Sequence, residues 1–552
     1  MKYGGNGGDK SEKSAKKSVK PEVKKSPAWA EQAKTLAKIP ETVPYLIIGA
    51  GTAAFSAARS IRSRDPKAKI VVIGEESYSP YMRPPLSKEL WLTPANDDTV
   101  EANSIEQPAF LQWSGRPRSV FLEKSQFYCA LEELQTRENG GISIGHGLRV
   151  VSLNPRKQTV TVMPSLADIY DSEAPRREIS YGKCLIATGG KPKSIPQFDN
   201  IVGKSENVTF YRNIDDFKKL TDTADRIGKS GTGKIVIVGG GFLGSELAFA
   251  LAWRASQKGY KYKVSQVIRE RGLLDHVLPS YLSGWTTDKL AEAGVEIVSA
   301  VDIKKVQSGN NMVKMTLSDG KELEADHVIL ATGIEPNTEL AEGAGLEVDA
   351  HIGGIAVNSE LLARNNIWAA GDVSSFYDPR LKARRRVEHH DQAIVSGRLA
   401  GENMAGANKV YSQQAMFWSD MGPNISFEAV GLVDASLQTF AVFAKPEAKD
   451  ETKKEDFKKG VVFYMSNPKD QNEDRRLVGL LLWNLPGRLG LARRLLKDQP
   501  CLDGIDGGTA TLTEMARIMQ LNDDDAELAG LTSDTTDVDD EAEQKILDQG
   551  QQ

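Results

Sequence analysis

The chain has 552 residues, of which 40% are apolar and 26% charged, and this length predicts two to four soluble domains with separate cores. No apolar run approaches the roughly 18 residues of a membrane-spanning helix, and the net charge of −5 disfavours a general attraction to nucleic acid. Three widely spaced cysteines form no CxxC or CxxxxC motif, which disfavours a redox dithiol and a zinc site: Cys129, Cys184 and Cys501.

The first 41 residues contain ten lysines and no arginine, and they are rich in Ser and Gly. A mitochondrial presequence is amphipathic and rich in arginine, so this composition disfavours one. We expect residues 1–41 to be a flexible, basic tether in solvent, without a membrane anchor. The alternative is a basic arm that touches a membrane or a nucleic acid.

A βαβ unit is predicted from residue 44, where an apolar run at 45–48 precedes a glycine turn, an Ala-rich helix through residue 62 and a second apolar run at 69–73. The turn fits the G-x-G-x-x-[G/A] pattern, in which glycines let the backbone approach a pyrophosphate at a helix N-terminus. The acidic residue after the second strand can hold ribose hydroxyls. The predicted dinucleotide site comprises Gly49, Ala50, Gly51, Thr52, Ala53 and Glu75.

A second βαβ unit is predicted far downstream, with a strand at 234–238, a glycine turn at 239–244, a helix at 245–256 and a strand at 264–269. Two units so far apart predict two separate dinucleotide-binding domains. Glu270 occupies the acidic position, where it would repel a 2′-phosphate and so favour NAD(H) over NADP(H). Arg269 and Arg271 flank this residue and weaken the preference.

Three other predicted strands end in glycine motifs. Residues 180–190 and 325–337 each read as a buried strand that ends in Ala-Thr-Gly, and residues 366–372 end in Gly-Asp. Glycine at such an exit lets the chain turn beside a cofactor, and Asp372 can accept a hydrogen bond from a hydroxyl group. The ordered set GxGxxA, ATG, GxGxxG, ATG and GD is more specific than any of its members.

The pattern changes from about residue 415, which predicts a third domain of the α+β class. Strand-like runs at 439–443, 460–464 and 477–483 precede a helical pattern at 489–496. The charged stretch 445–459 is predicted to be a mobile loop, and the acidic tail from residue 521 is predicted to be disordered.

The ordered glycine motifs resemble the flavoprotein disulfide reductase superfamily, in which an NAD(P) domain interrupts an FAD domain. The first helix here has no CxxxxC motif, so the resemblance implies electron transfer without a dithiol. Five segments narrow the resemblance to the apoptosis-inducing factor family over about residues 44–520. They are YMRPPLSKELW at 81–91, GGGFLGSEL at 239–247, RRRVEHHD at 384–391, SGRLAGENM at 396–404 and MFWSD at 416–420.

The resemblance implies an α/β fold with two Rossmann-like domains and a C-terminal α+β domain. Residues 42–190 and 335–411 would form the FAD-binding domain, and residues 191–334 the NAD(H)-binding domain between them. Residues 412–520 would form the C-terminal domain for dimerisation and partner binding, and residues 521–552 the tail.

The resemblance also implies roles for individual residues and predicts no metal site. Lys88 would contact the flavin, where a cation stabilises negative charge on the reduced ring, and Glu246 would be its partner. Phe242 would lie where nicotinamide enters, and His389 would meet both rings, so these four are the predicted catalytic residues. The predicted FAD residues are Gly49, Ala50, Gly51, Thr52, Ala53, Glu75, Glu76, Arg83, Lys88, Val150, Arg212, Asp372, His389, His390 and Trp418. The predicted NAD residues are Gly240, Gly241, Phe242, Leu243, Glu270, Gly333, Glu388, His389, Trp418 and Glu428.

Two departures from the family pattern affect regulation. His276 aligns where the family has a lysine, which predicts weaker binding of an anionic cofactor. The stretch 445–459 is short for the family's regulatory loop, so coupling between NADH binding and loop release is expected to differ.

The resemblance implies a slow FAD-dependent NADH oxidoreductase that forms a lasting complex of reduced flavin with NAD⁺ and dimerises on reduction. It further implies the mitochondrial intermembrane space or inner membrane, a disulfide-relay oxidase as partner, and weak DNA association in the nucleus after release through the cytosol in cell death. Two alternatives stay open: a redox-sensing binding protein or import-assembly factor with negligible turnover, and a plain NADH-dependent flavin reductase of an electron-transfer chain. The sequence does not identify the electron acceptor.

Overall fold

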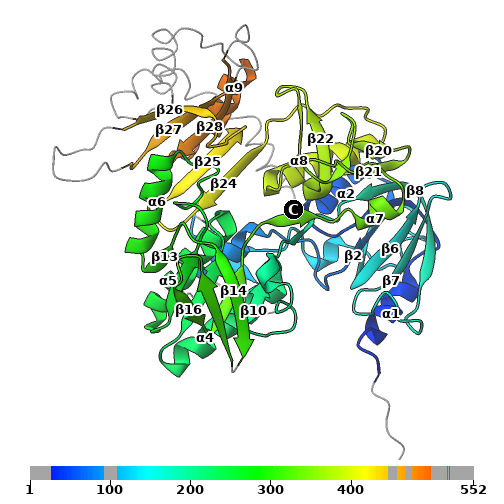
Figure 1. The fold of residues 1–552 in the computed structure, drawn as a ribbon. Coiled ribbons are helices and arrows are strands. Elements are labelled where there is room, and N and C mark those ends of the chain that lie inside the picture. The colour runs from blue at the N-terminus through cyan, green and yellow to red at the C-terminus, as the bar shows by residue number, and fades with distance from the viewer. Residues whose placement is uncertain are drawn as a thin grey trace, which may run out of the picture.

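The computed structural model describes residues 26–92, 108–112, 114–309, 311–444, 457–467 and 475–498, together with Met519 and Leu521. Figure 1 shows three sheet-based parts, with the third part beside the second and the first on the opposite side. Within the described residues, every helix is too short or too polar to cross a membrane.

The first part is a mixed sheet of eight strands that carries one of the large hydrophobic cores. Strands β21, β8, β1, β2 and β5 run parallel, and their apolar runs are buried on both faces, as parallel sheets require. The sheet comprises β1 (Thr42–Ile48), β2 (Lys69–Gly74), β5 (Gly141–His146), β6 (Leu148–Asn154), β7 (Thr159–Pro164), β8 (Arg177–Ile186), β20 (Leu362–Arg364) and β21 (Ile367–Ala369). A small sheet beside it contains β19 (Ile355–Ala356), β22 (Ser374–Asp378) and β23 (Ala383–Arg385), and a short helix is α7 (Glu339–Gly343).

Helices α2 (Thr52–Arg64) and α8 (His390–Met404) pack closely although they lie far apart in the sequence. A Cβ at Gly397 would lie 2.3 Å from the carbonyl oxygen of Ala53, and one at Gly401 would lie 2.4 Å from that of Ala57. Only glycine permits this approach, so the segment after the Gly-Asp motif returns onto the first helix and completes the first part.

The predicted tether is wrong for its last residues, because helix α1 (Ala30–Lys38) is ordered against the first part. Leu36 and Ile39 are buried in the core, and Gln32 donates to Ser165 at 3.2 Å. The spacing of the apolar residues puts them on one face of a helix, a signal that the lysine count obscured. The remainder of the predicted tether, residues 1–25, lies outside the described residues.

The second part is an all-parallel sheet of five strands in the order β10-β17-β11-β12-β13. Its strands are β10 (Val208–Phe210), β11 (Lys234–Val238), β12 (Lys263–Val267), β13 (Val295–Val298) and β17 (His327–Leu330), with α4 (Ile214–Ser230), α5 (Phe242–Lys258) and α6 (Ser280–Glu292). A smaller sheet of β14 (Ile303–Gly309), β15 (Met312–Leu317) and β16 (Glu322–Ala325) adjoins it.

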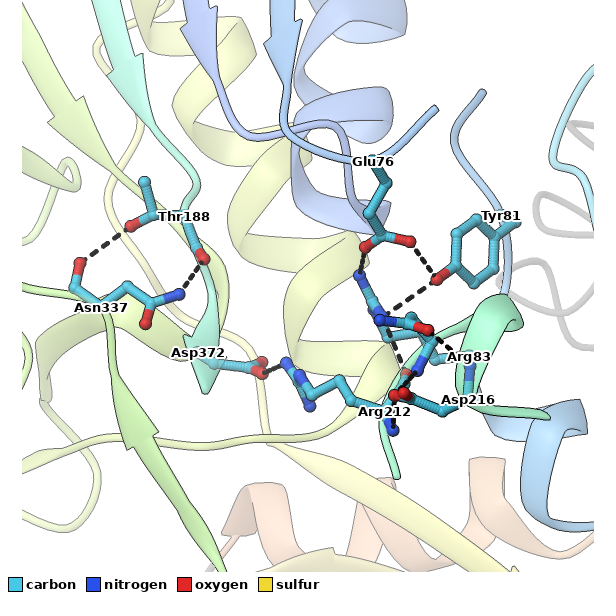
Figure 2. Close-up of polar contacts among 9 residues, drawn as sticks. Glu76, Tyr81, Arg83, Thr188, Arg212, Asp216, Asn337 and Asp372 are labelled. Atoms are coloured by element: carbon cyan, nitrogen blue, oxygen red, sulfur yellow. Dashed lines mark hydrogen bonds and ion pairs between the residues drawn. The ribbon is translucent and has the colours of Figure 1, made fainter. Parts of the chain in front are cut away.

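The two crossings between the first and second parts pair with each other. Strand β9 (Gly190–Pro192) runs antiparallel to β18 (Ile334–Pro336). Thr188 donates to the carbonyl oxygen of Asn337 at 3.0 Å, and the amide of Asn337 donates back to that of Thr188 at 2.8 Å (Figure 2). The chain therefore enters and leaves the second part through one two-stranded antiparallel ribbon, β9 with β18, whose strands are hydrogen-bonded to each other.

The third part is an antiparallel sheet in the order β24-β25-β28-β27-β26 with helix α9 against it. Its elements are β24 (Met416–Asp420), β25 (Ser426–Gly431), β26 (Gln438–Phe443), β27 (Gly460–Met465), β28 (Leu477–Trp483) and α9 (Leu489–Asp498). The three predicted strands and the helix are confirmed, whereas β24 and β25 were not predicted. Most of the predicted loop, 445–456, and the predicted tail from 522 lie outside the described residues.

A short connecting region between β2 and β5 contributes the 3-10 turn η1 (Pro84–Ser87), helix α3 (Glu89–Leu92) and strands β3 (Ala109–Leu111) and β4 (Pro117–Ser119). Helix α3 and η1 contact α5 of the second part. This region therefore carries the PPLSK sequence from the first sheet to the second.

Candidate dinucleotide site

The two glycine turns have the same backbone geometry in their separate sheets. Gly49 follows β1 with φ +102°, and Gly239 follows β11 with φ +123°. A Cβ at Gly49 would lie 2.2 Å from the carbonyl oxygen of Ala187, and one at Gly239 would lie 2.2 Å from that of Ala331. Ala187 and Ala331 begin the two Ala-Thr-Gly motifs, so each motif packs behind its own turn.

Each turn opens onto a helix start that has no side-chain cap in the described part of the chain. Gly51 is the N-cap of α2 and Gly241 is the N-cap of α5, and a Cβ at either glycine would meet nothing within 4 Å. Open space beside uncapped backbone N–H groups, at the positive end of a helix, suits a phosphate. The residues of both turns therefore fit the pyrophosphate of a dinucleotide.

Figure 2 shows a chain of polar contacts that joins the end of β2 to the Gly-Asp motif. Arg83 donates to Glu76 at 2.5 Å, to the Tyr81 hydroxyl at 3.0 Å and to the carbonyl oxygen of Arg212 at 2.8 Å. The guanidinium of Arg212 lies 3.2 Å from the carboxylate of Asp372. Burial and the nearby charge of Arg83 lower the pKa of Arg212. Four of the predicted FAD residues therefore meet, and their two adjacent guanidinium groups suit an anionic ligand.

The two acidic residues after β2 have different surroundings. Glu75 lies 3.2 Å from Arg149 on β6 and its side chain is 60% exposed, whereas Glu76 turns inward to Arg83. Val150, beside Arg149, packs partly buried against the core of the first part. Both carboxylates lie at the strand end where a ribose is expected, and their ligand roles stay predictions.

Glu270, after β12, lies at the equivalent end of the second parallel sheet. Its carboxylate is 3.4 Å from Arg269 and 3.5 Å from His276, whose side chains are 73% and 82% exposed. Exposed ion pairs contribute only about 0–1 kcal/mol, so neither of these exposed side chains fixes the carboxylate strongly.

The predicted pairing of Lys88 with Glu246 is confirmed. Nζ of Lys88 is 2.8 Å from Oε2 of Glu246, and both side chains are buried. Oε2 also accepts a hydrogen bond from Ser87 at 2.5 Å, and Oε1 accepts one from Ser419 at 2.7 Å. A buried carboxylate requires such donors because removing its charge from water is costly. Lys88 follows η1, Glu246 lies on α5 and Ser419 lies on β24, so all three parts meet at this carboxylate.

An aromatic cluster lies at the start of α5. The ring of Phe242 is 5.3 Å from Phe417, 5.9 Å from His389 and 6.2 Å from Phe427, measured between ring centroids. His389 stacks on Phe417 at 4.4 Å with an interplanar angle of 18°. Phe242 is therefore covered by the first and third parts at the position where the resemblance predicts that nicotinamide enters.

The histidine pair is neutral at neutral pH. Burial, followed by the positive charges of neighbouring side chains, lowers the pKa of both His389 and His390 to about 4. The ring of His390 lies edge-on to Trp418 at 6.0 Å, and its Nδ1 lies 3.4 Å from the hydroxyl of Thr52. Each neutral ring offers one hydrogen-bond donor and one acceptor, but the pair adds no fixed positive charge.

The other predicted NAD residues take varied positions. A Cβ at Gly240 would lie 3.0 Å from the side chain of Ile268, whereas Gly333 has φ +108° and open space around it. Leu243 packs against the core of the second part. The remaining two are Glu388, whose pKa is raised by burial and which pairs with Arg386, and Glu428, which lies opposite Trp418 in the β24–β25 pair.

A cavity of about 1850 Å³ lies between α2, α8, the region that connects β2 to β5, and the third part. Its lining includes Thr52, Lys88, His390 and Trp418, and it extends past several arginines over α2 and α8. Four of the fifteen predicted flavin residues therefore border a space large enough for a dinucleotide.

The sequence reasoning missed several residues of the site. Ser87 and Ser419 lie inside the PPLSK and MFWSD segments, but the sequence alone assigns them no role because a serine carries no charge and forms no pattern of its own. Phe417 was missed likewise. Tyr81 donates to Glu76 at 2.6 Å, and Asp216 accepts from the backbone N–H of Arg212 at 2.7 Å (Figure 2). Both contacts are local in sequence, but no motif marks either residue.

Comparison with protein families decides the class. Residues 43–397 match the family described as pyridine nucleotide-disulphide oxidoreductase, which covers more than half of the 552 residues. The chain belongs to this family. Residues 400–454 and 446–498 match the C-terminal region described as that of a mitochondrion-associated apoptosis-inducing factor. Members of the family are FAD-dependent oxidoreductases that use NAD(P)H, so FAD and NAD(P)H are the cofactors of this chain.

Two relatives support the narrower resemblance. A Dictyostelium discoideum protein named apoptosis-inducing factor 1, mitochondrial, is 36% identical over 84% of this chain and 80% of its own length. A Drosophila melanogaster relative described as an apoptosis-inducing factor 1, mitochondrial, is 42% identical over 88% of this chain, which spans 66% of that relative. The chain therefore belongs to the apoptosis-inducing factor branch of the family.

A solved structure agrees on the fold. Putidaredoxin reductase, in a covalent complex with putidaredoxin, has a TM-score of 0.65 over 88% of this chain and 100% of its own, at 22% identity. The predicted fold class is confirmed.

Proposed function

We propose that this protein is an FAD-dependent NADH oxidoreductase of the apoptosis-inducing factor type. The observation that carries the proposal is the buried Lys88–Glu246 pair, which joins the two dinucleotide folds beside a large cavity. FAD held at the first glycine turn would supply an isoalloxazine ring that takes a hydride from a nicotinamide. The protein supplies binding, orientation and electrostatics.

Lys88 would place a fixed cation beside the flavin, because Glu246, Ser87 and the protein around them hold its ammonium group in a buried position. Such a cation stabilises the negative charge of the reduced ring. Phe242 would occupy the nicotinamide position until substrate displaces it from between His389 and Phe417. The neutral His389 would pack against the nicotinamide without repelling the positive charge that develops on it.

NADH, rather than NADPH, would be the substrate because Glu270 follows β12 at the acidic position of the fold, where a carboxylate would repel a 2′-phosphate. The side chains of Arg269 and His276 are exposed, so their attraction for a 2′-phosphate would offset the repulsion from Glu270 only weakly. The preference is therefore expected to be clear but not absolute.

An anaerobic titration of the purified protein with NADH and with NADPH tests the proposal. We expect NADH to bleach the visible flavin absorbance in a stoichiometric reaction and to give a new long-wavelength band from the complex with NAD⁺. NADPH is expected to require a higher concentration. A flavin that NADH cannot reduce would contradict the proposal.

A redox sensor is the second candidate, and the contacts of β24 favour it. Phe417, Trp418 and Ser419 are consecutive residues of the third part, and all three reach the site. A change in the redox state of the flavin would therefore alter the contacts of this sheet directly. Gel filtration with and without NADH separates the candidates: an NADH-dependent change in size with poor turnover supports the sensor, whereas rapid turnover by an unchanged monomer supports a plain reductase.

We also propose a mitochondrial location, since two relatives are named as mitochondrial proteins. Residence in the intermembrane space, a disulfide-relay oxidase as partner, dimerisation, and association with DNA after release stay predictions from the resemblance. Fractionation of cells that express a tagged chain at its natural level tests the location.

A further inference from the structure

The carboxylate of Glu246 receives hydrogen bonds from two sides of the molecule. Ser87 and Lys88, both in the region that connects to the first sheet, donate to Oε2, while Ser419 of β24 donates to Oε1 at 2.7 Å. Ser419 has no exposed surface, and Glu246 is 4% exposed. The third part therefore contributes a buried polar contact to the pair that sets the charge beside the flavin.

The position of Ser419 allows its hydroxyl to fix the orientation of the Glu246 carboxylate. A glutamate side chain has three rotatable bonds, and Lys88 holds only one of its two oxygens. The hydroxyl of Ser419 fixes the other oxygen, so the carboxylate cannot turn about its last bond. Strand β24 is paired with β25 over five residues and contacts α5 and α8, so the position of the Ser419 hydroxyl is fixed by its strand.

We propose that Ser419 is a positioning residue through which the C-terminal sheet sets the reduction potential of the flavin. This inference rests on the proposed function. Without the hydroxyl, the charge of Glu246 loses a donor and Lys88 loses a fixed partner. Both changes leave the negative charge of a reduced flavin less stabilised, so the midpoint potential falls.

The test is the midpoint potential of the full-length FAD-loaded protein with Ser419→Ala. We expect a fall of about 15–30 mV, equivalent to a threefold to tenfold change in the equilibrium of a two-electron couple. The KM for NADH is expected to stay unchanged, because the Ser419 hydroxyl bonds to Glu246 and not to Glu270. Ser419→Thr keeps the hydroxyl and is expected to restore the potential.

Ser426→Ala is the matched control, since Ser426 is exposed and its hydroxyl donates at 2.5 Å to Asp420 of the neighbouring strand rather than to Glu246. It is expected to leave the potential unchanged. If Ser419→Ala does not fold, Ser419→Cys replaces it, because a thiol of similar shape is a weak donor. An unchanged or raised potential in a folded Ser419 variant overturns the inference. A wild-type protein that NADH cannot reduce would instead overturn the proposed function.

Discussion

The first and second glycine turns match in backbone geometry, yet their surroundings differ. Behind Gly49 and Gly239, the same Ala-Thr-Gly carbonyl lies 2.2 Å from where a Cβ would be. Around the first turn, however, Arg83 and Arg212 are partly buried and tied to Glu76 and Asp372 in one network. Around the second, the carboxylate of Glu270 faces mostly exposed partners.

This difference shows how the same glycine turn can bind either a ligand that stays bound or a ligand that exchanges. A ligand that is hydrogen-bonded to buried charged side chains dissociates slowly, because breaking charge-assisted hydrogen bonds away from water is costly. A ligand held by an open turn and one carboxylate exchanges readily. We therefore infer a resident FAD at the first turn and an exchanging NADH at the second.

The largest expected effects come from a side chain at either turn. Gly49→Val is expected to yield protein almost without flavin, because the new side chain meets the Ala187 carbonyl and the backbone has φ +102°. Gly239→Val is expected to keep the flavin but to prevent its reduction by NADH. Absorbance spectra and protein assays give the flavin content of each variant.

Gly203→Val is the control for these variants. Gly203 has φ +79° but open space around it, so the backbone strain is similar and the clash is absent. Gly49→Val protein with as much flavin as the other two variants would show that the first turn does not hold FAD.

A large effect on stability is expected where the two folds join. Lys88→Met leaves the buried carboxylate of Glu246 without its cation, which is expected to lower the free energy of unfolding by about 3–5 kcal/mol. The hydrogen bonds from Ser87 and Ser419 remain and place the loss at the lower end. Chemical denaturation measures it, and the double variant with Glu246→Leu is expected to recover stability without recovering the rate of flavin reduction.

The sequence specified the backbone devices and the charged residues of this site. The glycine turns could be predicted because their conformation excludes other residues, and Lys88, Glu246 and Asp372 could be predicted because their segments resemble a known family. Ser419 and Phe417 could not, because a hydroxyl or a ring gains its role only from the partner that folding brings to it. Helix α1 was missed because a lysine-rich composition masked the buried face of Leu36 and Ile39.

A smaller effect is expected on cofactor choice. Glu270→Gln removes the charge that opposes a 2′-phosphate, and the ratio of kcat/KM for NADH over NADPH is expected to fall about tenfold. Flavin content is expected to stay the same. A ratio that does not move would mean that the ribose lies elsewhere.

The smallest effect is expected at His276, which is 82% exposed. His276→Lys adds a positive charge beside Glu270 and is expected to lower the KM for NADH by about twofold to threefold at low salt, an advantage that salt screens. A series of KM measurements at rising ionic strength checks this. An advantage that persists at high salt would indicate a direct contact rather than a field effect.

The comparison of the two turns is tested most directly by native mass spectrometry of the oxidised wild-type protein after gel filtration with and without excess NAD⁺, because only a species that exchanges slowly stays bound. For oxidised protein without NADH we expect one FAD on each chain, and for protein given excess NAD⁺ and then filtered we expect FAD alone. Protein that loses its FAD on filtration, or that keeps NAD⁺ as firmly as FAD, would contradict the account.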